Sequence, residues 1–241
     1  MATTTFTPSM LRGAGTRGIP EIPAGSSFSN TYSLAFDGTD DYVDTNSYDL
    51  DATNGLTLSF WIKYDQASVT GLNWVCSRGG TGGTNSQFNT RLVADGRWFN
   101  YFQGGAGYTG ITGLSDDNWH HLVQTVNYTT GDVKFYKDSV ISSTVLTWGS
   151  TYNTATLSVI GGANTTPVYP YTGNVDNFSI FESIQDVNVL WNGGSPGDLT
   201  SLNPTLWYQF NAGSGTTAID SGTAGNNGTI NGATYQTDVP T

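Results

Sequence analysis

The stretch that decides the fold is Leu56-Thr-Leu-Ser-Phe-Trp-Ile-Lys-Tyr64. Every second residue in it is a large apolar one, and these residues share one face if the chain is extended. They are Leu56, Leu58, Phe60, Ile62 and Tyr64. Successive side chains of a β-strand point to opposite faces, so this alternation indicates a β-strand and not a helix.

Other runs from residue 32 onward have the same strand character, and turns rich in Gly, Asn and Asp separate them. They are Ser33 to Phe36, Asn73 to Cys76, Thr90 to Ala94, Trp98 to Phe102, Trp119 to Tyr128, Asp132 to Tyr136, Thr156 to Ile160, Asn174 to Phe181 and Leu206 to Phe210. Thr129-Thr130-Gly131-Asp132, between two long runs, predicts a hairpin. Many short strands at this spacing predict an all-β antiparallel sandwich.

One segment has helical character and departs from the β pattern. Ser183 is the predicted N-cap, with Asp186 at the spacing of a capping box and Gly193 suited to a left-handed stop. The apolar residues at helical intervals are Ile184, Val187, Leu190 and Trp191. The sequence therefore predicts a helix of two or three turns here.

Residues 1 to about 30 contain several prolines and glycines and almost no alternation, which predicts an extended or irregular arm. The arm is either a leader without a role or an anchor laid on a neighbouring subunit. We therefore divide the chain into an arm, residues 1–30, and a sandwich, residues 31–241.

The charge balance excludes several partners. The 241 residues include 8 Lys and Arg against 19 Asp and Glu, a net charge of -11. The few cations are scattered and form no basic stripe, so neither nucleic acid nor anionic lipid is an expected partner. No apolar run approaches the ~18 residues of a membrane span. The beginning lacks a secretory signal, and Cys76 has no second cysteine with which to form a disulfide.

Four segments, in order, resemble the laminin-G-like branch of the concanavalin A-like lectin/glucanase superfamily. They are Leu34-Ala-Phe-Asp-Gly-Thr-Asp-Asp-Tyr-Val43, Leu56 to Ile62, Asp117-Asn-Trp-His-His-Leu-Val-Gln-Thr-Val126 with Gly131 to Asp138, and Tyr171-Thr-Gly-Asn-Val-Asp-Asn-Phe-Ser-Ile-Phe181. The resemblance covers residues 32–193 and implies a concanavalin A-like jelly-roll sandwich. The family commonly has Asp-Gly after the second strand of the hairpin, whereas Ser139 follows Asp138 here.

Two segments of the tail, Leu206 to Asp220 and Gly225 to Tyr235, resemble the part that usually precedes the opening strand of these domains. Here they follow the helix. The tail is either a permuted edge of the same sandwich or the start of a second copy. We favour a permuted edge over residues 200–241, because a lone fragment could not bury its own face and the termini of a domain often lie close together.

The resemblance also raises glycan hydrolysis, which in this superfamily uses paired carboxylates, usually two Glu on one strand. This chain has two glutamates, Glu21 in the arm and Glu182 before the helix. His120 and His121 would point to opposite faces of a strand and cannot jointly ligate a metal. We therefore expect no enzymatic activity and no catalytic residues.

Calcium is the one cofactor that the resemblance implies. Hard cations bind carboxylate, amide and carbonyl oxygens, and the loop from Asp220 to Thr229 is rich in them. The candidate ligands are Asp176, Asp220 and Asn227. The alternative is turn chemistry, in which these side chains hydrogen-bond their own backbone. The dense aspartates at 37, 40, 41 and 44 likewise indicate a solvated or calcium-binding turn more than an acid/base pair.

Glycan recognition would use exposed aromatic rings as stacking surfaces. The candidates on predicted loops and strand ends are Tyr42, Trp98, Tyr101, Tyr108, Trp148 and Tyr169, with Tyr152 and Tyr171 less favoured. The alternative for each is packing in the core.

We therefore expect a non-enzymatic surface module that binds a glycan or receptor and is displayed on a virion, as a capsid decoration or a tail or fibre subunit. The virion assignment rests on family analogy to phage structural proteins, with residues 1–30 contacting neighbouring virion subunits. The alternatives are a purely structural decoration protein without a ligand and a secreted or cell-surface lectin-like adhesion module. A homo-oligomer is compatible with all three.

Overall fold

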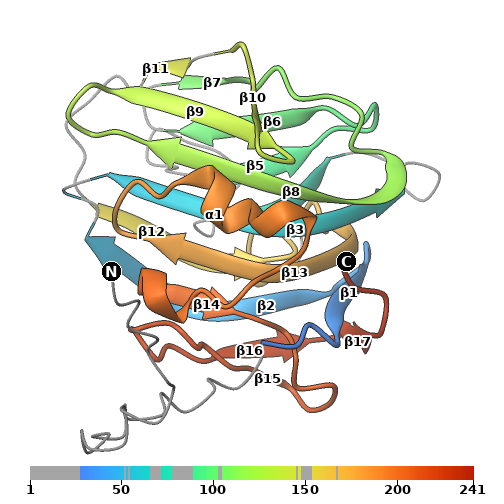
Figure 1. Cartoon of the computed structure of the whole chain (residues 1–241). Coiled ribbons are helices and arrows are strands. Elements are labelled where there is room, and N and C mark those ends of the chain that lie inside the picture. The colour runs from blue at the N-terminus through green and yellow to red at the C-terminus, as the bar shows by residue number, and fades with distance from the viewer. Residues whose placement is uncertain are drawn as a thin grey trace, which may run out of the picture.

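The computed structural model describes residues 28–241 except 52, 54, 66–71, 78–88, 103–104, 145, 148–153 and 167. The predicted arm therefore lies outside the described residues apart from its last three. Figure 1 shows two antiparallel β-sheets packed face to face, with a short helix on the outer face of one of them. The predicted all-β sandwich is confirmed.

The first sheet has nine strands, in the order β10-β9-β8-β3-β13-β1-β17, with β11 paired to β9 and β14 paired to β13. Their bounds are β1 Ser33–Asp37, β3 Leu56–Asp65, β8 Asp116–Val126, β9 Asp132–Lys137, β10 Val140–Ile141, β11 Leu146–Thr147, β13 Thr172–Phe181, β14 Leu206–Tyr208 and β17 Thr234–Gln236.

The second sheet has eight strands, in the order β15-β16-β2-β12-β4-β5-β6-β7. Their bounds are β2 Tyr42–Asp51, β4 Asn73–Ser77, β5 Asn89–Leu92, β6 Trp98–Phe102, β7 Gly105–Tyr108, β12 Thr154–Ile160, β15 Thr217–Ala218 and β16 Gly228–Asn231.

The decisive strand β3 lies in the middle of the first sheet, between β8 and β13. Its predicted apolar face is fully buried in the core. On its other face, Trp61 is buried and stacks on Trp191 of the helix, with ring centroids 5.2 Å apart. The helix segment therefore covers part of this face of β3.

The two sheets meet through aromatic side chains. Phe60 of β3 packs edge to face against Trp98 of β6, with ring centroids 6.1 Å apart. Trp98 also packs against Phe135 of β9, at 5.1 Å. Aromatic pairs in these geometries add to the free energy of burying the rings themselves.

The helix α1, Val187–Trp191, is shorter than predicted, and its cap differs. Asp186 is the N-cap, and its carboxylate accepts a hydrogen bond from Asn188 N at 2.9 Å. Ser183 was therefore wrongly predicted as the cap. The left-handed stop falls on Asn192, and Gly193, also left-handed, follows it. Two 3₁₀ turns follow, Asn192–Gly194 and Thr200–Leu202. None of the helices in the described residues is long and apolar enough to cross a membrane.

The predicted hairpin at residues 129–132 is present between β8 and β9, and Gly131 has a φ of 78°. Asp138 and Ser139 form the next turn, with φ of 51° and 64°. Both central residues are thus left-handed, as in a two-residue hairpin turn that ordinarily uses glycine.

The tail strands belong to this sandwich. Strands β14 and β17 add to the first sheet, beside β13 and β1, whereas β15 and β16 extend the second sheet beyond β2. Residues 206–236 thereby complete one edge of each sheet.

Candidate functional site

A row of four large side chains crosses the outer face of the second sheet. Trp74 of β4 lies opposite Arg91 of β5, Arg91 lies opposite Phe99 of β6, and Phe99 lies opposite Tyr108 of β7. Directly opposite residues on neighbouring strands have their Cβ atoms close enough for the side chains to touch. We call these four residues, together with Tyr101 and Tyr169, the aromatic platform.

The alternation of the strands fixes the direction of this row. Trp98 and Leu92 are fully buried in the core. Their neighbours Phe99 and Arg91 must therefore project from the opposite face of the sheet. Both are partly exposed, as expected for an outer face.

Trp74 lies between two tyrosine rings. Its ring is nearly parallel to that of Tyr101, at 5.7 Å and 15°, and to that of Tyr169, at 6.2 Å and 14°. The backbone carbonyl of Tyr169 accepts a hydrogen bond from Trp74 N at 3.2 Å, which holds this tyrosine against β4. Trp74 is 2% exposed, whereas Tyr169 is 40% and Tyr108 43% exposed. The tyrosines therefore form the accessible surface of the platform, and Trp74 supports them.

Arg91 joins the two halves of the platform. Its guanidinium carbon lies 4.1 Å from the ring centre of Phe99 and 4.8 Å from that of Tyr101. A guanidinium over an aromatic face is attracted by the negative face of the ring. No described residue accepts a hydrogen bond from Arg91 or from Nε1 of Trp74. The guanidinium is thus held over the two rings, and its N–H groups have no acceptor among the described residues.

Arg97 has a different role at the rim of the platform. It also lies over an aromatic ring, 4.0 Å from the centre of Tyr108. Unlike Arg91, it is paired with a carboxylate, that of Asp95. Its charge is therefore largely compensated, and it stabilises the position of Tyr108.

The structure brings together three of the predicted glycan-contacting residues, Tyr101, Tyr108 and Tyr169. Tyr42 lies outside the platform on β2, opposite Asn231 of β16, and Trp148 lies outside the described residues. Trp98 requires a correction. It is 0% exposed between Phe60 and Phe135, so its ring cannot stack on a ligand. The less favoured Tyr171 is equally buried, and Tyr152 is among the undescribed residues.

Sequence reasoning missed Trp74, Arg91 and Phe99. Trp74 and Arg91 fall in predicted strands, where they were not singled out. Phe99 adjoins Trp98 in Trp-Phe-Asn-Tyr-Phe, and both residues are large and apolar. A usable signal was the isolated arginine inside a strand next to an aromatic strand, since a cation on an outer face is stabilised there by facing rings.

The predicted calcium ligands, Asp176, Asp220 and Asn227, make hydrogen bonds within the chain. Both carboxylate oxygens of Asp220 accept hydrogen bonds from backbone N–H groups. The donors are Trp207 N at 2.7 Å, Gly222 N at 2.8 Å and Asn226 N at 2.8 Å. The amide oxygen of Asn227 accepts from Asp220 N at 2.9 Å. These bonds are of the kind that the turn-chemistry alternative describes, in which side chains of the turn hydrogen-bond nearby backbone groups.

Asp176 is enclosed in a similar way. It is 0% exposed, and its carboxylate accepts hydrogen bonds from Asn30 Nδ2 at 2.7 Å and Asn177 N at 2.7 Å. Burial raises its pKa to about 8, against the opposing effect of these hydrogen bonds. Phe28 stacks on Trp207 nearby, at 5.9 Å, and Trp207 donates to Asn177. Asp176 thus helps to hold the end of the predicted arm on the sandwich.

A different set of carboxylates meets the geometric condition for a hard cation. Oxygens of Asp37, Asp40 and Asp41 lie within 4.8 Å of one another in the turn after β1. Asp41 is mostly buried, and burial raises its pKa above the ordinary value. Asp41 also accepts a hydrogen bond from Asp37 N at 2.8 Å.

The two histidines have separate surroundings, in agreement with the prediction that they cannot share a metal. His120 contacts the carboxylates of Asp138 and Asp116, at 2.8 and 3.1 Å. His121 is buried, 2.8 Å from Ser59 Oγ and stacked on Trp61. Burial lowers the pKa of His121 to about 3, so it is neutral at physiological pH.

Comparison with known proteins agrees with this architecture. Residues 37–184 match the laminin G family of the concanavalin A-like lectin/glucanases superfamily. No curated protein matches the chain. A structure from Bacteroides ovatus, named as a candidate carbohydrate binding protein, is 17% identical, with a TM-score of 0.67 over 88% of this chain and 62% of that one. This chain therefore spans less than two thirds of that protein.

Two further solved structures resemble the chain. The heptameric SAP-like pentraxin of Limulus polyphemus is 14% identical, with a TM-score of 0.51 over 67% of this chain and 81% of that one. Domains LG4-5 of the mouse laminin alpha1 chain are 13% identical, with a TM-score of 0.47 over 65% of this chain and 43% of that one. At these identities the two structures with the higher scores show a shared fold and nothing more.

The buried carboxyl of Asp176 predicts a pH-dependent stability. Its pKa rises from 3.8 in the unfolded chain to about 8 on folding. The folded state then holds a proton that the unfolded chain loses above pH 3.8, so the stability from this group falls as pH rises toward 8. Asp176→Asn should therefore be more stable than the wild type at pH 8, by on the order of a few kcal/mol, with little difference at pH 4.

Urea unfolding of both proteins at pH 4, 6 and 8 measures this effect. The exposed Asp198→Asn is the matched control and should not show a stabilisation that grows with pH. If the difference in free energy of unfolding between Asp176→Asn and the wild type is the same at all three pH values, Asp176 does not hold a proton in the folded state as predicted.

Proposed function

We propose that this chain, which belongs to the concanavalin A-like lectin/glucanases superfamily, is a non-enzymatic module that binds saccharides on the aromatic platform. The observation that carries the proposal is the cross-strand row of Trp74, Arg91, Phe99 and Tyr108, with Tyr101 and Tyr169 beside it. These residues combine exposed rings with a guanidinium that has no acceptor among the described residues.

The chemistry of the platform suits a sugar ring. A pyranose has a C–H face that packs on an aromatic ring and hydroxyl groups around its edge that need hydrogen-bond partners. Tyr169 and Tyr108 provide the exposed rings, and tyrosine loses little side-chain entropy on binding. Arg91 can donate N–H groups to hydroxyl or carboxylate oxygens in a fixed geometry. A guanidinium without an acceptor among the described residues favours saccharides that present hydroxyl or carboxylate acceptors beside the rings.

The surroundings of the platform support binding over hydrolysis. Retaining hydrolysis needs two carboxyl groups ~5–5.5 Å apart at the scissile bond. Among the described residues of β4 to β7 and their connecting turns, Asp95 is the acidic residue, and it is paired with Arg97. Glu182 lies elsewhere, accepting a hydrogen bond from Asp51 N at 2.7 Å.

A glycan array with the full chain tests the proposal. The wild type should bind a defined subset of glycans, and Tyr169→Ala should weaken that binding about tenfold, since removing a stacking aromatic costs ~1–2 kcal/mol. Arg91→Met keeps the packing of the side-chain stem and should reduce binding of the same glycans.

Tyr42→Ala is the matched control, because it removes a partly exposed tyrosine of the same sheet outside the platform. It should bind as the wild type does. A folded wild type without a signal on any glycan, or equal losses in Tyr169→Ala and Tyr42→Ala, would contradict the proposal.

We further propose that calcium binds the turn that contains Asp37, Asp40 and Asp41. The support is the convergence of three carboxylates within 4.8 Å, since hard cations prefer such oxygens. Among the described residues, Asp176 and Asp220 of the first predicted set belong to no such convergence of three carboxylates.

Thermal unfolding in calcium and in EDTA tests the metal site. Calcium at 100 times its Kd should stabilise the wild type by about 2.7 kcal/mol, and Asp40→Asn should reduce that gain. Asp132→Asn, on β9, is the control and should keep it. Equal melting temperatures of the wild type in calcium and EDTA would contradict calcium binding.

Display on a virion, with residues 1–27 reaching a neighbouring subunit, remains our proposal for the biological setting. Phe28 and Asn30 pack on the sandwich, so a truncation that removes residues 1–27 leaves those contacts intact. Quantitative mass spectrometry of purified particles should find the full chain at a fixed copy number and the truncated chain depleted. Absence of the full chain from particles, or equal incorporation of both, would contradict this setting.

A further inference from the structure

A cavity of about 200 Å³ lies among the tail residues, away from the aromatic platform. Its walls come from the segment 209–212 after β14, from Ile219 and Ser221 around β15, and from Tyr235 of β17. In the second sheet, β15 is the edge strand opposite β7, so the cavity and the platform occupy opposite edges of the sandwich (Figure 1).

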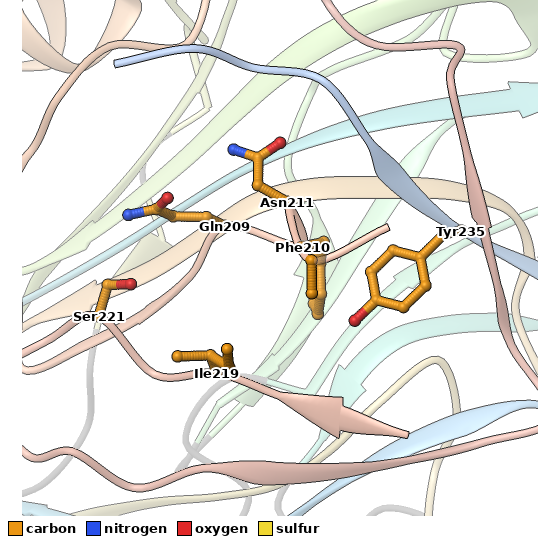
Figure 2. A pocket seen from close by; sticks show the side chains of 7 residues that line it. Gln209, Phe210, Asn211, Ile219, Ser221 and Tyr235 are labelled. Carbon is orange, nitrogen blue, oxygen red and sulfur yellow. The ribbon is translucent and has the colours of Figure 1, made fainter. Parts of the chain in front are cut away.

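The walls of the cavity combine apolar surfaces with hydrogen-bonding groups. Figure 2 shows Phe210 and Tyr235 on one side, Ile219 below, and the amides of Gln209 and Asn211 above. Ile219 is 56% exposed, although a large aliphatic side chain usually avoids water. The side chains of Gln209 and Ser221 make no hydrogen bond with any described residue. The cavity therefore offers both an apolar face and unused polar groups.

The polar edge of the cavity is preorganised. The amide oxygen of Asn211 accepts hydrogen bonds from Thr31 N at 2.9 Å and Tyr32 N at 3.1 Å. These bonds fix the orientation of the amide and leave its Nδ2 without a partner among the described residues. The hydroxyl of Tyr235 donates to Thr217 O at 3.4 Å, and Tyr32 packs edge-on against the Tyr235 ring at 6.4 Å.

Phe210 is held in a strained backbone conformation. Its φ is 55°, in the left-handed region that L-residues with bulky side chains rarely adopt. Its ring packs on Tyr208 at 6.2 Å, which compensates part of this cost. Such strain often accompanies binding sites, because it directs a side chain into a position that a relaxed backbone conformation would not give it.

The charges around the cavity select a neutral ligand. None of its lining residues carries a formal charge. Asp220 lies between Ile219 and Ser221, but its carboxylate is turned toward the N–H groups of Trp207, Gly222 and Asn226. The volume is below the ~300–1,000 Å³ of sites for drug-sized molecules, so a single ring fits.

We propose that this cavity is a second saccharide site, independent of the platform, that binds one neutral sugar ring. The ring packs on Tyr235 and Ile219, above the buried Phe210, and its hydroxyl groups bond to Gln209, Asn211 Nδ2 and Ser221. With sites at two opposite edges, one chain bridges two glycan branches or two glycan chains and gains avidity from doing so.

Side-chain amide NMR on the ¹⁵N-labelled full chain tests this inference. The probes are glucose, galactose, mannose, N-acetylglucosamine and fucose, each titrated separately. At least one should shift the Gln209 and Asn211 amide signals saturably. Gln209→Ala should weaken that sugar about fivefold, the effect of one lost neutral hydrogen bond. Ser221→Ala should also weaken it.

Gln236→Ala is the matched control, because Gln236 lies on β17 outside the cavity and donates to Thr234 Oγ1 at 3.2 Å. It should bind as the wild type does, as should Tyr169→Ala, whose defect would be confined to the platform. The inference is overturned if no sugar shifts the Asn211 amide, or if Gln209→Ala and Ser221→Ala both bind as Gln236→Ala does. If the aromatic platform binds no glycan, the expected shifts of the Gln209 and Asn211 amide signals are unchanged.

Discussion

The burial of Trp98 between Phe60 and Phe135 is the contact on which the arrangement of the platform depends. It joins the two sheets through the largest side chain of β6. Because strand residues alternate between faces, an inward Trp98 forces Phe99 and Tyr101 outward. The pairing of β5 and β6 then places Arg91 over both rings. The burial of Trp98 thereby decides which face of β6 carries Phe99 and Tyr101. The register between β5 and β6 decides that Arg91 is their neighbour.

Most of the fold could be predicted because alternation in β strands is a local property. The segment from Leu56 to Tyr64 predicts its strand within one residue, and the turn at Gly131 predicts its hairpin. The errors arose where tertiary contacts decide the outcome. Asp186 caps α1 in place of Ser183, because the chain turns into the helix later than the apolar spacing suggests.

The candidate site was predicted only in part, because tertiary contacts also decide which side chains of a strand reach the surface. Tyr101, Tyr108 and Tyr169 were identified by residue type and their place on loops and strand ends. In Trp-Phe-Asn-Tyr-Phe both faces of the strand are aromatic, so the sequence does not tell whether Trp98 or Phe99 is inside. Only the opposite sheet decides this. The acidic loops were similarly ambiguous: Asp220 and Asp37 lie in similar Asp-rich or Asn-rich turns in sequence, yet three carboxylates converge only in the turn of Asp37 among the described residues.

The central claim is that the row from Trp74 to Tyr108 is a saccharide-binding surface, and a crystal structure of the full chain with its tightest-binding array glycan tests it most directly. The account predicts a sugar ring packed on Tyr169 or Tyr108, with an oxygen within hydrogen-bond distance of Arg91. A glycan bound elsewhere, with the platform bare in every copy, would contradict it.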